Sequence, residues 1–140
     1  MIRKLQNGDI NRVTDLWLKT NLEAHNFIPG QYWTGNYEAV KKMLPQAEVY
    51  VYEENKIIQG FVGVQEEYIE GIFVSGKMQS HGIGKALLDY IKDKKDRLQL
   101  NVYQKNVRAM SFYQREGFTV QSERPDEFTG EKEYVMEWNR

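Results

Sequence analysis

Apolar residues recur along the chain with two spacings, and the longer spacing predicts helices. After the turn and cap at residues 7–9 they fall every three or four positions, which is typical of an amphipathic helix. A second, short helix must end at Pro45, because proline disfavours helix in the preceding residue. A third carries one apolar face, and a fourth begins at the cap Asn106 and closes at Gly117. The expected helices span about residues 10–21, 37–44, 83–96 and 106–117.

The shorter spacing predicts strands, in which alternate residues are apolar or a brief apolar run is bounded by turn residues. The aromatic segment between the first two helices, residues 24–33, fits neither spacing and is expected to be irregular. The expected strands span residues 2–6, 49–53, 57–65, 68–74, 98–102, 118–123 and 133–138.

The resulting order is β-α-α-β-β-β-α-β-α-β-β, which predicts an α/β (α+β) fold. The strand–helix–strand unit over residues 68–102 is a crossover and implies one parallel pair, whereas the hairpins imply antiparallel neighbours. We therefore expect a mixed, mostly antiparallel sheet with helices on both faces. No repeat or linker interrupts the chain, so residues 1–140 are expected to form a single domain.

The amino-acid composition and net charge exclude several classes of functional site and argue against some kinds of partner. The chain has no cysteine, which excludes disulfides, a cysteine nucleophile and thiolate metal sites. Its net charge of −1 argues against a general nucleic-acid binder, and no apolar run is long enough to span a membrane. No apolar stretch follows the N-terminal residues as in a signal peptide, so a cytoplasmic location is expected. No pattern in the chain indicates an oligomeric state.

The charges are unevenly distributed. Residues 71–115 carry a net charge of +6, whereas residues 1–70 carry −3 and residues 116–140 carry −4. A basic middle between acidic ends is compatible with a central anionic ligand and a cationic one nearby, and equally with ordinary surface scatter.

The loop of residues 79–84 carries the most specific local signal. A strand leads into a glycine-containing turn, and a helix starts at once. The first amides of such a helix lack intrahelical partners, and glycine at positions 82 and 84 lets an anion approach the main chain. Taken alone, the pattern is also compatible with a tight turn that needs glycine. Neither the P-loop pattern nor a full Gly-x-Gly-x-x-Gly pattern is present.

Two segments of the chain resemble sequence motifs of the GNAT (GCN5-related N-acetyltransferase) family, and they occur in the order and at the separation found in that family. Residues 79–84, Gln-Ser-His-Gly-Ile-Gly, match the family's Gln/Arg-x-x-Gly-x-Gly/Ala signature. Residues 101–106, followed by Ala109, Phe112-Tyr113 and Gly117-Phe118, resemble its second motif. The order of elements agrees as well, so the resemblance covers essentially the whole domain and is strongest to small single-domain bacterial acetyltransferases.

The resemblance implies acetyl-CoA as cosubstrate. The chain has only two histidines and no metal-ligand spacing, so no metal is expected. In the family the pantetheine arm lies along the fourth strand and main-chain amides hold the pyrophosphate. Asn106 would contact the cofactor near its pantetheine while also capping a helix, and Asn101 could hold a water or a cofactor amide. The implied cofactor residues are Ile72, Phe73, Val74, Gln79, Ser80, His81, Gly82, Ile83, Gly84, Lys85, Asn101, Asn106 and Tyr113. From the basic middle we infer candidates for the outer 3′-phosphate, each of which could also be an ordinary surface side chain: Lys77, Lys85, Lys105 and Arg108.

The resemblance also implies catalytic roles. Tyr113 occupies the position of the family's proton donor to the leaving thiolate, although a tyrosine on an amphipathic helix can serve packing alone. Glu67 and Glu70, at the fourth strand, are candidates for the base, or else exposed strand residues. Asn101 stands where certain N-terminal acetyltransferases carry a glutamate, and this departure weakens an N-terminal amine as acceptor.

The aromatic segment is the candidate acceptor pocket, since in relatives this region forms part of the acceptor wall. The candidate residues are His25, Phe27, Tyr32 and Trp33, with a structural role for the histidine as the alternative. The acceptor is expected to be a primary amine, either a small molecule or a protein lysine. The competing hypothesis is a non-catalytic acyl-CoA-binding sensor or interaction module. A nucleic-acid partner is not expected.

Overall fold

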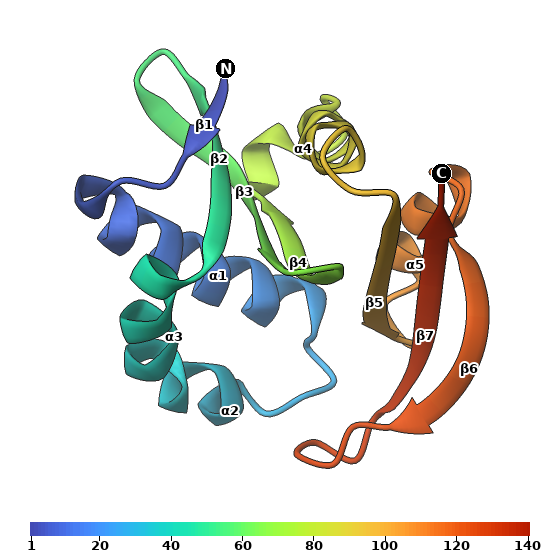
Figure 1. Cartoon of the computed structure of the whole chain (residues 1–140). Helices are drawn as coiled ribbons and strands as arrows, with labels where there is room; N and C mark the ends of the chain where they lie inside the picture. Colours follow the sequence, from blue (N-terminus) through green and yellow to red (C-terminus); the bar gives the residue numbers. More distant parts are fainter.

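The computed structural model describes all 140 residues and contains one seven-stranded sheet (Figure 1). The strand order is β1-β2-β3-β4-β5-β7-β6. The strands are β1 (Ile2–Lys4), β2 (Glu48–Glu54), β3 (Ile57–Gln65), β4 (Tyr68–Val74), β5 (Arg97–Tyr103), β6 (Thr119–Pro125) and β7 (Lys132–Asn139). The helices are α1 (Ile10–Ala24), α2 (Gly30–Gly35), α3 (Tyr37–Met43), α4 (Ile83–Lys92) and α5 (Val107–Arg115). None of them is long and apolar enough to cross a membrane.

Strand pairing confirms the mixed sheet predicted from the sequence. β4 and β5, joined through α4, form the parallel pair, and the other neighbours are antiparallel. Residues 57–65 and 68–74 form strands with the predicted limits.

Helices cover both faces, as the apolar pattern predicts, and each face has its own core. On one face, Val13 and Leu16 of α1 pack with Leu44 and with side chains of β2 and β3. On the other face, α4 buries Ile83, Leu87, Leu88 and Ile91 in a larger cluster that also contains Tyr113 of α5. The apolar residues whose 3.6-residue period predicts α4 are therefore the residues that pack the helix against the sheet.

The sheet splits between β4 and β5, and this split positions the site. The two strands pair only at Tyr68–Gln99 and Ile69–Leu100. On the opposite edge of β4, Val64 pairs with Ile69 and Gly63 with Gly71, so Glu70 is a bulge without a partner on β3. Beyond the bulge β4 stays with β3 and leaves β5, so that the two halves of the sheet diverge (Figure 1).

Three local predictions were wrong. α1 continues to Ala24 rather than ending near residue 21, and the aromatic segment expected to be irregular contains α2. Trp33 of α2 is buried, with its ring centroid 5.9 Å from that of Trp17, so long-range packing stabilises a helix too short to show a period. α4 ends at Lys92 rather than near residue 96, because no apolar residue continues its buried face there.

Candidate active site

A cleft of about 860 Å³ opens where β4 and β5 diverge. Its walls are the end of β4, the loop into α4, the first turn of α4, α5 and the C-terminal end of α1. The cleft brings together most of the residues predicted to bind the cofactor: Ile72, Phe73, Val74, Gln79, Ser80, Gly82, Ile83, Gly84, Lys85, Asn106 and Tyr113. The two sequence motifs, far apart along the chain, therefore meet at one place.

One wall of the cleft offers unpaired main-chain groups, and we call residues 72–74 and 79–85 the cofactor wall. Residues 72–74 lie beyond the β4–β5 pairing, so β4 has an unpaired edge there. Gly82 precedes α4 with φ of +83°, a left-handed conformation that favours glycine. No side chain caps this ten-residue helix, so its first amides remain free for an anion.

Side chains hold the loop of the cofactor wall in place. The side-chain Nε2 of Gln79 donates to the Val74 carbonyl at 3.2 Å. Arg108 of α5 donates to the side chains of Gln79 and Ser80, the latter at 3.0 Å. His81 is exposed, does not line the cleft, and lies with its Nδ1 3.0 Å from the Gln79 carbonyl. Arg108 thus connects α5 to the loop across the cleft.

Tyr113 projects from α5 into the cleft with only 7% of its surface exposed. Its hydroxyl has no hydrogen-bond partner within the chain. Burial raises the pKa of Tyr113 above its usual value, with a smaller contribution from Tyr68. The hydroxyl therefore stays protonated at neutral pH and is available as a donor.

Asn106 caps α5, as predicted, and also reaches across the cleft. Its Oδ1 accepts from the Ala109 amide at 3.2 Å, and its Nδ2 lies 3.0 Å from Nε2 of His25. His25 lines the cleft, whereas Phe27, Tyr32 and Trp33 do not. The ring centroids of Phe27 and Trp33 lie 5.7 and 5.4 Å from that of His25, and Tyr32 packs on Trp33 at 4.8 Å.

The family profile described as "Acetyltransferase (GNAT) domain" matches residues 23–140. This chain belongs to the GNAT family of acetyltransferases. It is 34% identical over 140 residues to the peptidyl-lysine N-acetyltransferase YiaC of Escherichia coli, covering 99% of this chain and 96% of YiaC.

Two solved structures share the fold of this GNAT acetyltransferase. The apo form of YjaB from Escherichia coli superposes with a TM-score of 0.87 at 21% identity, covering 99% of this chain and 96% of YjaB. The PaiA N-acetyltransferase of Thermoplasma acidophilum, in complex with coenzyme A, superposes with a TM-score of 0.83 at 19% identity. The latter match covers 100% of this chain and 98% of PaiA.

Of the four basic residues proposed to contact the 3′-phosphate, three line the cleft and one does not. Lys85, Lys105 and Arg108 line the cleft of this GNAT domain, and Lys77 does not. Lys85 pairs with Glu116 at 3.1 Å and with Asp89 at 3.3 Å, and Lys105 pairs with Glu131. These two ammonium groups are already neutralised in part, whereas Arg108 makes no ion pair and contacts only uncharged groups of the loop.

Neither carboxylate candidate lines the cleft. Glu70 sits in the β4 bulge beside the split; the residue is exposed, and partial burial of its carboxyl raises the pKa of that group. Glu67 is exposed in the turn before β4 and does not line the cleft. Asn101 of β5 lies outside the cleft as well, with one carboxamide atom 3.4 Å from Glu133 and 3.1 Å from Arg124.

Sequence reasoning missed Tyr68 and Glu133. The charges of Glu70 and Glu133 both act on Tyr68, and we call Tyr68, Glu70 and Glu133 the acceptor face. Burial first, then the charges of Glu70 and Glu133, raise the pKa of Tyr68 to about 12. Burial first, then Asp126, raise the pKa of Glu133. Only the strand register would reveal Glu133, because it lies on β7 opposite Tyr103 of β5.

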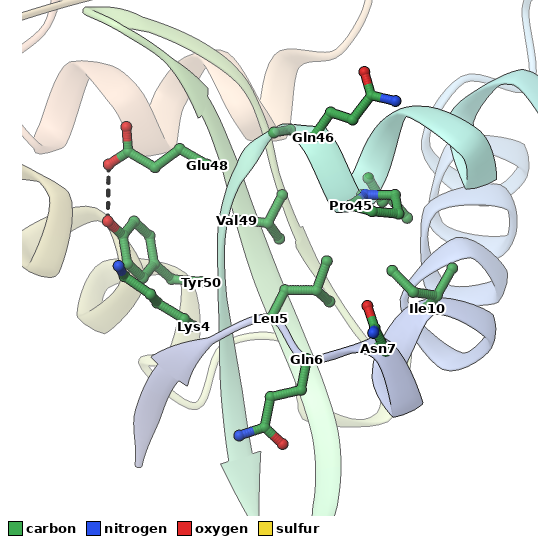
Figure 2. A pocket seen from close by; sticks show the side chains of 12 residues that line it. Lys4, Leu5, Gln6, Asn7, Ile10, Pro45, Gln46, Glu48, Val49 and Tyr50 are labelled. Carbon is green, nitrogen blue, oxygen red and sulfur yellow. Dashed lines mark hydrogen bonds between the residues drawn. The ribbon is translucent and has the colours of Figure 1, made fainter.

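A second hollow, of about 420 Å³, lies at the β1 and β2 edge of the sheet, away from the split (Figure 2). Leu5, Ile10 and Val49 line its apolar part, and Tyr50 donates to Glu48 at 2.8 Å. It contains neither family motif, so the cleft at the split is the candidate active site.

Proposed function

We propose that this protein transfers the acetyl group of acetyl-CoA to a primary amine, and that its acceptor is the side chain of a protein lysine. The observation that carries the proposal is that the cofactor wall and Tyr113, whose hydroxyl is protonated and has no partner, line the same cleft. The 34% sequence identity to a peptidyl-lysine N-acetyltransferase, over nearly the whole chain, supports the same activity.

The cleft fits acetyl-CoA in shape and in chemistry. The unpaired edge of β4 at residues 72–74 can bond an extended arm, and the free amides at the start of α4 suit a pyrophosphate. The coenzyme A complex of the fold relative PaiA is consistent with this assignment. When bound, acetyl-CoA supplies an acyl group activated as a thioester.

The chain's residues then have separate tasks. The amine must lose a proton before it can attack, and the Glu70 carboxylate accepts that proton, directly or through water. A main-chain amide of β4 polarises the carbonyl as charge develops on its oxygen. The new C–N bond forms as the C–S bond breaks. Tyr113 gives its hydroxyl proton to the leaving sulfur, which departs as the CoA thiol, and the second proton of the amine nitrogen returns through water to the tyrosinate. The chain forms no covalent intermediate in this scheme.

The acceptor face favours a cation that arrives on a protein. Glu70 and Glu133 bring negative charge to the split, which attracts an ammonium group. β6, at the edge of the sheet beside β7, is exposed along its whole length, so a bulky partner can approach from this side.

Tyr113→Phe tests the proposal. We expect the rate of acetyl transfer to a lysine peptide to fall about 100-fold, while the Kd for CoA, measured by calorimetry, changes less than about threefold. Mass spectrometry of a lysine peptide and of spermidine, each incubated with acetyl-CoA, identifies the acceptor class. Unchanged transfer by Tyr113→Phe would contradict the donor role, and acetylation of spermidine alone would contradict the lysine assignment. CoA binding without transfer to either acceptor would favour a non-catalytic sensor.

A further inference from the structure

His25 joins the two sides of the cleft through both of its ring nitrogens. Nδ1 lies 3.0 Å from Oδ1 of Asn21, one turn earlier at the end of α1. Nε2 lies 3.0 Å from Nδ2 of Asn106, the cap of α5 and 81 residues away in the sequence. A histidine with both nitrogens engaged inside the chain has none left for the amine.

The neighbours of the two asparagines define which ring nitrogen carries the proton. Asn106 Oδ1 accepts from the Ala109 amide, so its Nδ2 faces His25 and Nε2 must accept. Asn21 Nδ2 donates to the Trp17 carbonyl at 2.9 Å, so its Oδ1 faces His25 and Nδ1 must donate. Both ends independently require a neutral imidazole with its proton on Nδ1.

Packing keeps the ring in this position. Its centroid lies 5.4 Å from Trp33 in a stacked arrangement and 5.0 Å from Tyr103 of β5 edge-on. Burial lowers the pKa of His25 to about 4, which agrees with the neutral form at working pH.

We propose that His25 is a positioning residue that fixes the carboxamide of Asn106 in one orientation across the split and so sets the affinity of the cleft for CoA. This inference rests on the proposed function, because it assumes that Asn106 contacts the cofactor. With Oδ1 bonded to Ala109 and one N–H directed to His25, the second N–H of Asn106 has no partner within the chain. His25 therefore ensures that the cleft meets an amide donor, since a flipped carboxamide would present its oxygen instead.

Two substitutions at the same position separate the two ring contacts. His25→Gln places an acceptor near the position of Nε2 and keeps the reach to Asn106. His25→Asn can still donate to Asn21 but is too short to reach Asn106. We expect His25→Asn to raise the Kd for CoA and the KM for acetyl-CoA about tenfold, with the KM for the amine unchanged, and His25→Gln to stay within about threefold of wild type.

Equal affinity of His25→Asn and wild type would overturn the inference, and so would equal loss in both variants, which is the result of a purely structural role. Melting temperatures of the two variants check that they fold alike. Long-range ¹H–¹⁵N NMR of the wild-type protein gives a second test that needs no variant. A proton on Nε2 would overturn the inference, whereas a proton on Nδ1 supports it.

The two proposals fail differently. A wild-type chain that does not bind CoA would overturn the proposed function, and with it this inference. A wild-type chain that binds CoA, beside a His25→Asn variant that binds it equally well, would overturn only the role of His25. In a double-mutant cycle, His25→Asn should cost no further affinity in the Asn106→Ser background, where the cap is retained but the carboxamide is gone.

Discussion

The cofactor wall and the acceptor face meet at the same split in the sheet but are built differently. The cofactor wall offers unpaired main-chain groups, at a strand edge and at an uncapped helix start. The acceptor face presents side chains from β4 and β7, which are far apart in the sequence. A wall of main-chain amides can serve any chain that repeats its turn, whereas a face of side chains is specific to one protein and its acceptor.

Gly84→Glu tests the main-chain character of the cofactor wall and should give the largest effect. A Cβ at position 84 would lie 3.6 Å from the Phe112 ring, an ordinary contact, so the fold should tolerate a side chain. The added carboxylate would stand where the wall is proposed to bind an anion. We expect the Kd for CoA to rise about 1,000-fold, because the juxtaposition of like charges costs several kcal/mol. Calorimetry with CoA measures the change.

Gly84→Ala is the matched control, since it adds the Cβ without the charge. Its Kd for CoA should stay within about tenfold of wild type. If Gly84→Glu binds CoA as tightly as Gly84→Ala, the pyrophosphate does not lie at the start of α4, and the cofactor wall is assigned wrongly.

The cofactor wall is easier to predict from the sequence than the acceptor face, because it is built from local main-chain features. The Gly82-x-Gly84 turn, the strand before it and the apolar period of α4 are local features, so short-range pattern is enough to predict the cofactor wall. Tyr113 lies on a second motif whose approach to the first requires the fold, which the family resemblance supplied.

The acceptor side could not be predicted in this way. Glu133 belongs to the acceptor face because β7 pairs with β5, and Asn101, which contacts Glu133, does not line the cleft. The contact between His25 and Asn106 spans 81 residues, and the helix α2 that carries Trp33 is stabilised by packing against α1 rather than by its own period. None of these features leaves a signal in any short window of the sequence.

Glu70→Gln probes the acceptor face and should give an intermediate effect. Glu70 must be ionised to accept a proton, and burial raises its pKa, so kcat/KM of the wild type should fall as pH drops through a value above that of an ordinary glutamate. The substitution should lower kcat/KM about 100-fold near neutral pH and remove this acid limb. Rates over a pH series with saturating acetyl-CoA measure both changes.

Glu133→Gln is the comparison for Glu70. It removes negative charge from the same face without removing the proposed base, so it should raise the KM for the amine more than it lowers kcat. If Glu133→Gln instead abolishes the acid limb and Glu70→Gln retains it, the base lies on β7 rather than on β4.

Arg108→Gln should give the smallest effect, and it asks how far side chains contribute to the cofactor wall. Arg108 lacks an ion-pair partner and contacts Gln79 and Ser80, so its charge is free for the 3′-phosphate. We expect the Kd for CoA to rise about threefold, the typical worth of one exposed charge contact, with the Kd for dephospho-CoA unchanged. Lys77→Gln, outside the cleft, is the control and should change neither. Equal weakening of both ligands by Arg108→Gln would mean that Arg108 acts by holding the loop, which would leave the main chain as the only cofactor contact on this wall.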